Sequence, residues 1–531
     1  MLFRGGTVRT LDPDRPTTDA VLVSDGLVAA LGDDALAAAG EAEVLDLEGG
    51  ALLPGFGDGH VHPLWGGVEL SGAPVRDAAS VDEVAAAVRG HALAHPELEW
   101  VTGGSFDLAL TTDGRFDARW LDAAVPDRPV YLESADHHCA WVNTAALQIA
   151  GIDRATPDPP AGTVARRPDG SPMGTLVEWT AMDLVKRHLP HPTRQDKQAG
   201  IAAATSLLAA AGVTWAQEAA LSPADVPVYL ATAAAGELAV RVNIALRAEP
   251  REWRTQLTEF AAARALTVGN ADVSAQTVKI FADGVVEAGT AAMLEPYADA
   301  PGSTGLPVWS APELTEAMTA FDAAGFQCHV HAIGDAAIRR TLDAVEAVRA
   351  ANGERDRRPV VAHVQVVDPQ DLPRFARLGV VANLEPLWAC LDDVMSRLTA
   401  PRLGPVRTAR QYPLASLLAS GAHVSMGSDW PISSLRPLDG LAVAVTRQTA
   451  AGDPPGGWLP KERLTPQQAL TAYTGGSAYQ AFDDHRSGRI RTGGRADLVW
   501  LAADPVVTPP AAWSAIQVRG TWCDGRRTHG A

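Results

Sequence analysis

The sequence has 531 residues, of which 47% are hydrophobic and 20% are charged, and both fractions are typical of a globular rather than a disordered protein. Its 44 lysine and arginine residues against 63 aspartate and glutamate residues give a net charge of −19, which argues against nucleic acid or an anionic membrane surface as a partner. Its four cysteines are far apart in the sequence, which excludes a disulfide framework and a zinc knuckle.

The N-terminal residues contain no apolar stretch of the kind found in secretory signals, so we expect a cytoplasmic protein. One uncharged run, from Gln198 to Gln217, is long enough to cross a bilayer, but it consists mostly of alanine. We expect it to form a buried helix that turns at Gly212 into a strand, and we expect no contact with a membrane.

The two ends of the sequence both consist of short strand-like segments separated by Asp-Gly and Gly-Gly turns. These segments are Leu2–Val8, Ala20–Val23 and Ala42–Leu47 at one end, and Gly488–Ile490, Ala496–Leu501 and Ile516–Trp522 at the other. This arrangement predicts one small β-sandwich domain assembled from residues 1–53 and 481–531. Pairing of the strands within each end separately is the alternative.

Between these ends, over residues 54–480, apolar strand-like runs alternate with helical stretches rich in alanine and leucine, which is typical of a parallel sheet covered by helices. Eight such runs predict an α/β fold, a closed (β/α)₈ TIM-like barrel with its catalytic groups at the C-terminal ends of the strands. The runs are Leu53–His62, Val213–Glu218, Val240–Leu246, Thr277–Asp283, Phe326–His331, Val360–Val366, Val380–Leu384 and His423–Asp429.

Residues 63–211 are far too many for the connection between a strand and the next helix, and they contain a strand-like run of their own, Val130–Glu133. We predict an insertion of about 150 residues after the first barrel strand, because connections of this length are usually functional or independently structured. We expect the insertion to lie over the mouth of the barrel.

Four histidines and one aspartate fall at the C-terminal ends of the expected barrel strands. His60 and His62 point to the same side, because alternate residues of a strand share a face. His331 and His363 lie at the ends of the fifth and sixth strands, and Asp429 closes the eighth. Imidazole and carboxylate donors suit Zn²⁺ or Fe²⁺ and can leave a position open for water. We predict a divalent metal site, with Zn²⁺ as first choice and one or two ions per chain.

Lys279, on the fourth strand, is unusual for such a site because an ammonium group repels a cation. As a carbamate formed with CO₂, the same side chain becomes an anionic oxygen ligand that can bridge two metal ions. Alternatively, Lys279 could pair with Asp283. A second choice stays open on the fifth strand, where His329 shares a face with His331 and either could be the structural residue.

Five motifs of the sequence resemble those of the amidohydrolase superfamily: LLPGFGDGHVHP, VKIFADG, HVHAIGD, VAHVQ and GSDWP. More narrowly, the chain resembles the amidohydrolase-3 group, which includes N-substituted formamide deformylases. The segment SADHHCAWVNTAAL is similar to that group's D-G-H-S-A-W-x-N-S-x-A-L pattern, with matches at Asp136, His138, Trp141, Asn143 and Leu147. The segment GSPMGTLVEW matches P-x-G-x-x-x-E at Pro172, Gly174 and Glu178.

The resemblance implies the composite fold and places Lys279 at the superfamily's bridging, often carboxylated, lysine. It implies a hydrolase that cleaves a non-peptide C–N bond of an amide or formamide through a metal-activated water. In this reading Asp429 transfers the proton of the water to the leaving nitrogen, and His331 or His363 stabilises the oxyanion or binds the metal. A cyclic amidase or deaminase with the same chemistry is an alternative, and so is a non-catalytic binding protein built on the barrel.

The insertion is expected to supply the substrate-binding residues His138, Trp141, Asn143 and Glu178, as a lid that partly excludes water. The alternative is that Trp141 and Leu147 only pack the inserted segment. Glu178 could also be an additional ligand or a salt-bridge partner. The expected partner is a small-molecule substrate, and a homodimer is left open.

Overall fold

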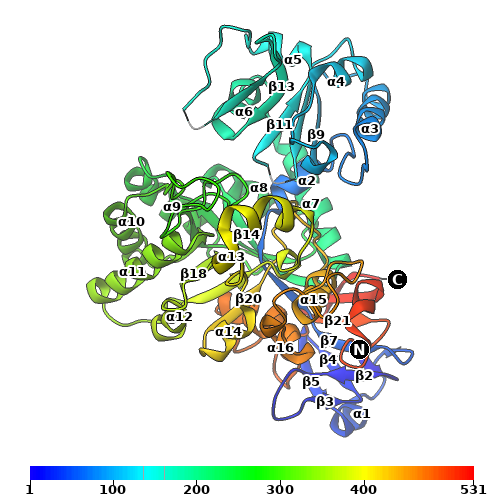
Figure 1. The fold of residues 1–531 in the computed structure, drawn as a ribbon. Helices are drawn as coiled ribbons and strands as arrows, with labels where there is room; N and C mark the ends of the chain where they lie inside the picture. The colour runs from blue at the N-terminus through cyan, green and yellow to red at the C-terminus, as the bar shows by residue number, and fades with distance from the viewer. Residues whose placement is uncertain (136, 161, 531) are drawn as a thin grey trace. The chain divides into compact units, whose positions relative to one another are not determined.

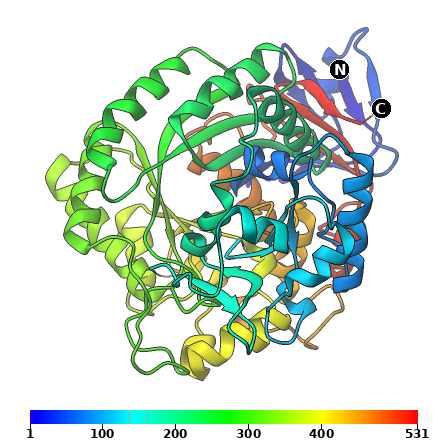
Figure 2. The same cartoon turned by 90° about the horizontal axis from the view of Figure 1, so that it is seen from above.

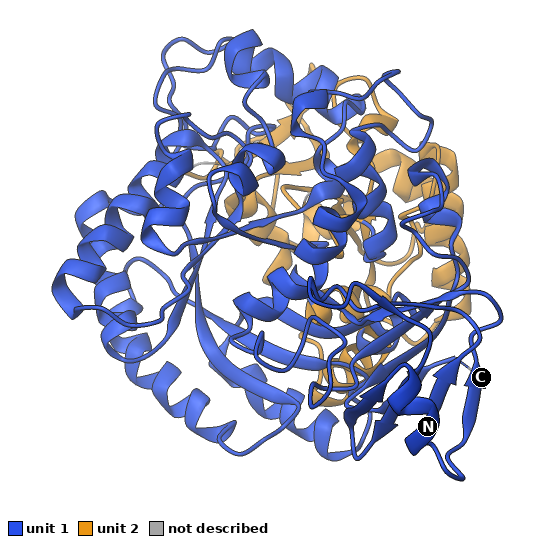
Figure 3. Ribbon diagram, turned by 90° about the horizontal axis from the view of Figure 1, so that it is seen from below, with its two compact units in different colours: residues 1–62, 205–429, 434–531 blue, residues 63–204, 430–433 orange. Residues whose placement is uncertain are grey.

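The computed structural model describes residues 1–135, 137–160 and 162–530, and the chain divides into two compact units (Figures 1 and 3). Unit 1 comprises residues 1–62, 205–429 and 434–531, and unit 2 comprises residues 63–204 and 430–433. Asp136, one of the motif matches in the sequence, lies outside the described residues.

Unit 1 contains one sheet of eight strands, which pair side by side in chain order and run parallel throughout. Each strand lies within or overlaps one of the eight predicted apolar runs, so the predicted (β/α)₈ fold is confirmed. The strands are β8 (Phe56–Val61), β14 (Val213–Leu221), β15 (Arg241–Arg247), β16 (Val273–Phe281), β17 (Gln327–Ala332), β18 (Val360–His363), β19 (Val381–Leu384) and β20 (His423–Met426).

Helices follow the barrel strands along the chain and lie around the barrel (Figure 2). In α11 (Asp335–Asn352) the buried residues Ile338, Leu342 and Val345 recur at helical spacing. The other helices of this part are α8 (Val226–Ala234), α9 (Trp253–Leu266), α10 (Ala311–Ala323), α12 (Leu372–Leu378), α13 (Ala400–Thr408), α14 (Leu414–Ala419), α15 (Pro437–Thr446), α16 (Pro466–Thr471) and α17 (Ser477–Gln480).

The first and last barrel strands meet at a seam that is held by a few specific hydrogen bonds. Asp429 N donates to His60 O at 2.7 Å, and the buried Asp58 Oδ1 accepts from Ser428 N at 3.0 Å and from His60 N at 3.2 Å. A side chain at Gly427 would place its Cβ 2.6 Å from His60 N, so the close approach of the two segments requires glycine there. The seam therefore brings two of the predicted metal ligands, His60 and Asp429, side by side.

A layer of buried polar side chains joins neighbouring strands inside the barrel. Asn243 Nδ2 donates to Gln217 Oε1 at 2.8 Å and to Thr277 Oγ1 at 2.7 Å, and Thr277 in turn donates to Gln327 Oε1 at 2.9 Å. The layer therefore links β14 to β17 through side chains whose polar atoms, in these contacts, all have hydrogen-bond partners.

Both chain ends contribute strands to one six-stranded sheet of order β23-β22-β21-β7-β2-β3, and both termini lie at this part of unit 1 (Figures 1 and 2). β7 (Ala51–Pro54) pairs antiparallel with β21 (Leu498–Leu501), which joins the two halves as predicted. Four other strands near the N-terminus form a separate sheet of order β5-β4-β1-β6. The remaining strands are β1 (Leu2–Arg4), β2 (Thr7–Arg9), β3 (Thr17–Thr18), β4 (Val21–Ser24), β5 (Leu27–Leu31), β6 (Val44–Asp46), β22 (Val518–Cys523) and β23 (Arg526–His529).

One predicted strand of this region is wrong, and the strands β3, β5 and β23 were missed. Residues Gly488–Ile490 form turns and bends rather than a strand, and Ile490 N makes a single hydrogen bond to Thr10 O. Of the missed strands, β23 follows the Asp524-Gly525 turn. Both turn residues have positive φ, as hairpin turns of this kind require.

Unit 2 has a five-stranded sheet of order β12-β13-β11-β10-β9. The run predicted from the sequence is β10 (Val130–Ser134), and the other strands are β9 (Val101–Phe106), β11 (Cys139–Val142), β12 (Thr163–Arg166) and β13 (Pro172–Val177). Its helices include α2 (Pro63–Glu69), α3 (Val81–Ala94), α4 (Ala118–Ala124), α5 (Thr144–Ile149) and α6 (Trp179–Lys186).

The uncharged run at 198–217 forms the end of α7 (Arg194–Ala210) and the start of β14. Among the helices of the described residues, none is long and apolar enough to cross a membrane. The four cysteines are all buried and free, in agreement with the prediction that they form no disulfide framework.

Candidate metal centre

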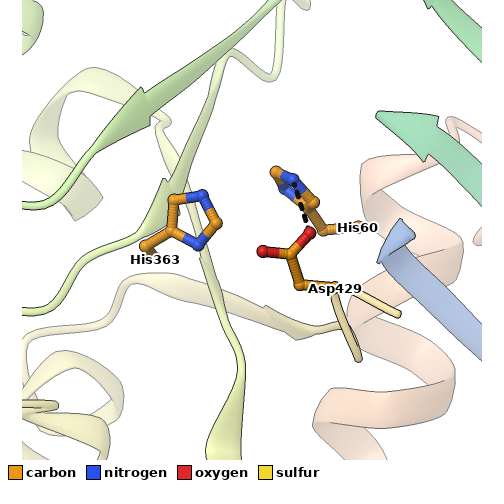
Figure 4. A group of neighbouring side chains, drawn as sticks. All are labelled: His60, His363 and Asp429. Carbon is orange, nitrogen blue, oxygen red and sulfur yellow. Dashed lines mark ion pairs between the residues drawn. The ribbon is translucent and has the colours of Figure 1, made fainter. Parts of the chain in front are cut away.

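The residues predicted to bind a metal lie at the C-terminal ends of the barrel strands. The side chains of His60, His363 and Asp429 each place one donor atom within 4.8 Å of the others, and all three are buried (Figure 4). Asp429 Oδ1 lies 3.6 Å from His60 Nε2 and 3.1 Å from His62 Nε2. Lys279 Nζ lies 3.1 Å from His60 Nε2. The structure thus brings five of the six predicted ligands into one buried cluster.

The two histidines of β17 have different surroundings. His329 has no exposed surface, and its Nε2 lies 2.9 Å from His60 Nδ1, on the side of the His60 ring away from Lys279. The ring of His331 lies beside that of His363, with a centroid distance of 4.5 Å, and its Nε2 contacts Gly284 O at 3.2 Å. This geometry supports His331 as the sixth ligand and His329 as the residue that orients His60.

Burial has a strong effect on the nitrogen groups of the cluster. It lowers the pKa of His60 well below its ordinary value, and the nearby Lys279 ammonium lowers it further. Burial also lowers the pKa of Lys279 to about 7. A neutral imidazole is the form that binds a metal, and a neutral amine is the form that reacts with CO₂, so both shifts are in the direction that the predicted roles of these two residues need.

His62 has a carboxylate partner, Glu218, that the sequence analysis missed. His62 Nδ1 lies 3.6 Å from Glu218 Oε1, and the hydroxyl of Tyr229 donates to Glu218 Oε2 at 2.5 Å. Although burial lowers it, the hydrogen bonds to Asp429 and Glu218 raise the pKa of His62 to about 9. Glu218 is the last residue of a predicted apolar strand, which is the same signal that identified Asp429.

A second missed carboxylate, Glu385, directly follows β19. Its side chain has no exposed surface, and Oε2 accepts a hydrogen bond from His363 Nδ1 at 2.8 Å. Burial raises the pKa of Glu385, while the neighbouring His363 opposes that shift. Glu385 directly follows the predicted apolar run Val380–Leu384, and a charged residue at that position could have identified it from the sequence.

Asp283, the other acidic residue near Lys279, holds the loops around the site. It accepts hydrogen bonds from three backbone amides, those of Ala292 at 2.8 Å, Ile333 at 3.1 Å and Gly334 at 2.8 Å. Burial raises its pKa to about 7, against the effect of these amides. Its Oδ1 also lies 3.7 Å from His331 Nε2, whereas Lys279 contacts His60, so the alternative of a Lys279–Asp283 pair finds no support in these contacts.

The backbone is strained at two of the predicted ligands. His363 has a φ of 76°, Asp429 has a φ of 52°, and Val364 beside His363 has a φ of 45°. Positive φ is rare outside glycine and is a genuine outlier for a β-branched residue such as valine. Such conformations cost about 1–3 kcal/mol each and occur mostly at functional sites, where the surrounding structure enforces them.

Two of the four residues predicted to bind substrate are core residues of unit 2. Trp141 is fully buried against Phe116, at a centroid distance of 5.0 Å, and its indole N–H donates to Asp117 O at 3.1 Å. Asn143 is also fully buried, and its Oδ1 accepts from Val130 N at 2.9 Å and caps α5. Neither side chain reaches the surface of the unit, which favours a packing role over the predicted substrate contact for both.

The other two, His138 and Glu178, form a partly exposed pair. His138 Nδ1 lies 3.0 Å from Glu178 Oε2, with side-chain exposures of 18% and 22%. The ring of Trp179 stacks on His138 at a centroid distance of 5.8 Å. Glu178 has φ 68° and ψ 154°, a conformation that is strained for any residue except glycine. This pair therefore keeps the features of a binding site, whereas Trp141 and Asn143 do not.

Comparisons with known proteins agree with this geometry. A family model described as "Amidohydrolase family" matches residues 43–529. The chain is 32% identical to Protein LONG AFTER FAR-RED 3 of Arabidopsis thaliana over 95% of this chain and 87% of that one, and 28% identical to the N-substituted formamide deformylase of Arthrobacter pascens over 99% and 97%. A crystal structure of an uncharacterized metal-dependent hydrolase from Pyrococcus furiosus superimposes with a TM-score of 0.74, at 25% identity over 95% of this chain and 99% of that one.

Proposed function

The chain belongs to the amidohydrolase family, and from this premise we propose that it is a metal-dependent hydrolase of small molecules that cleaves a C–N bond other than a peptide bond. The observation that carries the proposal is the convergence of His60, His363 and Asp429 within 4.8 Å in a buried cluster. The substrate we propose is a linear amide or an N-substituted formamide. The similarity over almost the whole length to a protein named N-substituted formamide deformylase supports the formamide.

The side chains present fit a divalent transition metal. Imidazole nitrogen and carboxylate oxygen are ligands that Zn²⁺ favours, and the cluster contains both in a water-poor setting. We propose that Zn²⁺ is held by His60, His62, Lys279, His331, His363 and Asp429, with one or two ions per chain. A carbamate on Lys279 would complete a two-ion site. The burial of Lys279 favours the neutral amine, from which a carbamate forms.

When bound, the ion would polarise the scissile carbonyl and make a water molecule more acidic. Asp429 takes a proton from the attacking water and delivers it to the leaving nitrogen, because its Oδ1 lies among the imidazoles and is buried from bulk solvent. His331 stands at the edge of the cluster, 8% exposed, where donating a hydrogen bond to the developing oxyanion is the alternative to binding the ion. His363 binds through the nitrogen that Glu385 leaves free.

We propose further that His138 and Glu178 contact the substrate. The carboxylate of Glu178 keeps His138 oriented at 3.0 Å, and the strained backbone at Glu178 is the kind of feature that persists where function requires it. Trp179, stacked on His138 and 41% exposed, offers an apolar surface next to this pair.

The experiment combines elemental analysis with a screen of N-formyl and N-acyl amines. We expect at least one equivalent of metal per chain and turnover of one of these amide classes. Asp429→Asn should fold normally and lose about 10²–10⁴-fold in kcat, the usual contribution of a proton-transferring group. Asp322→Asn is the matched control, since Asp322 is a buried carboxylate that pairs with Arg357 outside the cluster.

Two outcomes would contradict the proposal. A normal kcat in Asp429→Asn would remove the assigned proton carrier. Fewer than about 0.2 metal atoms per chain after gentle purification, with no binding of added Zn²⁺, would favour the alternative of a barrel used only as a binding scaffold.

A further inference from the structure

Glu385, like Asp58, is a buried carboxylate of the barrel with one oxygen that has no hydrogen-bond partner among the described residues, and of the two it is the one that contacts the side chain of a predicted ligand through its other oxygen. The residue is completely buried and Oε1 is the unpartnered atom. Leaving a buried acceptor unpaired is costly, and native proteins rarely do so without a reason. Its other oxygen, Oε2, is engaged at 2.8 Å by His363 Nδ1.

The contact with Glu385 determines which nitrogen of His363 is available to a ligand. A carboxylate oxygen can only accept a hydrogen bond, so Nδ1 of His363 must carry the proton. In a neutral imidazole the lone pair then lies on Nε2. His363 therefore offers Nε2 to the cluster that it forms with His60 and Asp429.

The segment that carries Glu385 also holds the face of the same ring. Trp388, three residues later in the short 3₁₀ turn Pro386–Trp388, stacks on His363 at a centroid distance of 5.5 Å and an interplanar angle of 11°. The edge of the imidazole is thus held by Glu385 and its face by Trp388. The backbone at His363 is also strained, with a φ of 76°.

We propose that Glu385 is a positioning residue of the metal centre: it fixes the His363 tautomer and orientation, and its unpartnered oxygen adds negative charge beside Asp429. This inference rests on the proposed function, in that it requires a cation in the cluster. Carboxylates that receive the second N–H of a metal-bound histidine typically affect metal affinity by 10–100-fold.

Two substitutions separate the two effects of the carboxylate. Glu385→Ala removes both the acceptor and the charge, and we expect it to weaken Zn²⁺ binding by about 10–100-fold. Glu385→Gln keeps the shape and an acceptor oxygen but removes the charge, and we expect a smaller loss of about tenfold. Asp322→Asn, the buried carboxylate paired with Arg357, is the control and should bind Zn²⁺ like the wild type.

The measurement is a competition titration of each metal-free protein with Zn²⁺ against a chromophoric chelator. A second readout is the visible absorption spectrum of the Co²⁺-substituted proteins, which reports the geometry of the ligands and is insensitive to packing elsewhere. Thermal unfolding of the metal-free variants establishes that each is folded. If Glu385→Ala fails to fold, the isosteric Glu385→Gln carries the test.

The outcomes are distinct. Weaker Zn²⁺ binding and an altered Co²⁺ spectrum in the Glu385 variants alone would support the inference. Wild-type affinity and an unchanged spectrum in both variants would overturn it and leave the proposed function intact. A wild-type protein that binds no divalent ion would overturn the proposed function, and the positioning role with it.

Discussion

The buried ion pair between Arg241 and Asp497 joins the barrel to the terminal sheet, and its removal should destabilise unit 1 strongly. Arg241 begins β15 and Asp497 immediately precedes β21. The two form a bidentate contact, with Nη1–Oδ1 at 2.8 Å and Nη2–Oδ2 at 2.5 Å, and both are more than nine-tenths buried. Arg241→Met leaves Asp497 as an uncompensated buried charge, which costs about 3–5 kcal/mol.

The assay is thermal unfolding followed by circular dichroism. An unfolding entropy of about 2.1 cal/mol/K per residue, over roughly four hundred residues of unit 1, gives about 0.8 kcal/mol/K. The predicted loss therefore corresponds to a fall of about 4–6 °C in the melting temperature. The double variant Arg241→Met with Asp497→Asn should melt higher than Arg241→Met alone, because the buried charge has been removed.

The pH dependence of this pair has a definite sign. Burial raises the pKa of Asp497, but the charge and hydrogen bonds of Arg241 outweigh burial, so the net pKa is lowered. A lowered pKa in the folded state contributes stability that is fully present above the unfolded pKa of about 3.9 and is lost as the pH falls below it. On acidification from pH 5 to pH 3, Asp497→Asn should therefore lose less stability than the wild type.

Two results would refute this account of the ion pair. One is a fall of less than about 1 °C in the melting temperature of Arg241→Met, and the other is a double variant that is no more stable than Arg241→Met alone.

Arg241 of this pair also contacts a second group of side chains whose donor atoms are close enough together to hold a metal ion. Asp497, Cys523 and Asp524 place one donor atom each within 4.8 Å of the others. The guanidinium of Arg241 already lies among them, with Nη1 at 3.0 Å from Asp524 Oδ2 and at 3.2 Å from Cys523 Sγ. The guanidinium of Arg241 thus already supplies the positive charge that a metal ion would bring to these three side chains.

Three further predictions concern the site and unit 2. His331→Ala should weaken Zn²⁺ binding by at least about tenfold. His329→Gln keeps a hydrogen-bonding group near His60 and should have a smaller effect in the same titration. Equal effects would contradict the assignment of His331 as the ligand and His329 as the residue that orients His60. Trp141→Ala should destabilise unit 2 by about 3–5 kcal/mol through loss of core packing, whereas His138→Ala should leave the melting curve unchanged and raise KM. Chelation should lower the melting temperature of the metal-loaded protein, because a ligand at a thousand times its Kd contributes about 4 kcal/mol of stability; an unchanged curve would contradict a resident metal.

The fold could be predicted from the sequence because its strongest signals are local. A buried parallel strand is a short apolar run, and every barrel strand of this chain has one. Unit 2 lacks this signal. Its strand Val101–Phe106 contains Gly103 and Gly104, and Pro172–Val177 begins with proline and contains Gly174 at a φ of 117°. Both residue types are depleted in strands, so four of the five strands of this sheet were missed.

The motif in unit 2 could not reveal which of its residues face inward. The sequence matched Trp141, Asn143, His138 and Glu178 equally well. Burial, however, depends on the pairing of β11 between β10 and β13, which places Trp141 in the apolar core. An asparagine that caps a helix and an asparagine that contacts a substrate look the same in a motif. The distinction requires the hydrogen-bond partners of its side chain.

The choice between His329 and His331 shows where sequence reasoning ends at the site itself. Alternation along a strand puts both on the interior face of the barrel, but at different depths. Depth is determined by the register between neighbouring strands, which sets His329 beside Lys279 and His331 beside Phe281. That register follows from closure of the whole barrel, because strand tilt and stagger are linked once a sheet closes. The pairing of β18 with β19 likewise places Glu385 beside Nδ1 of His363, so the predicted ligands and this carboxylate are brought together by contacts between strands, which no single segment of the sequence contains.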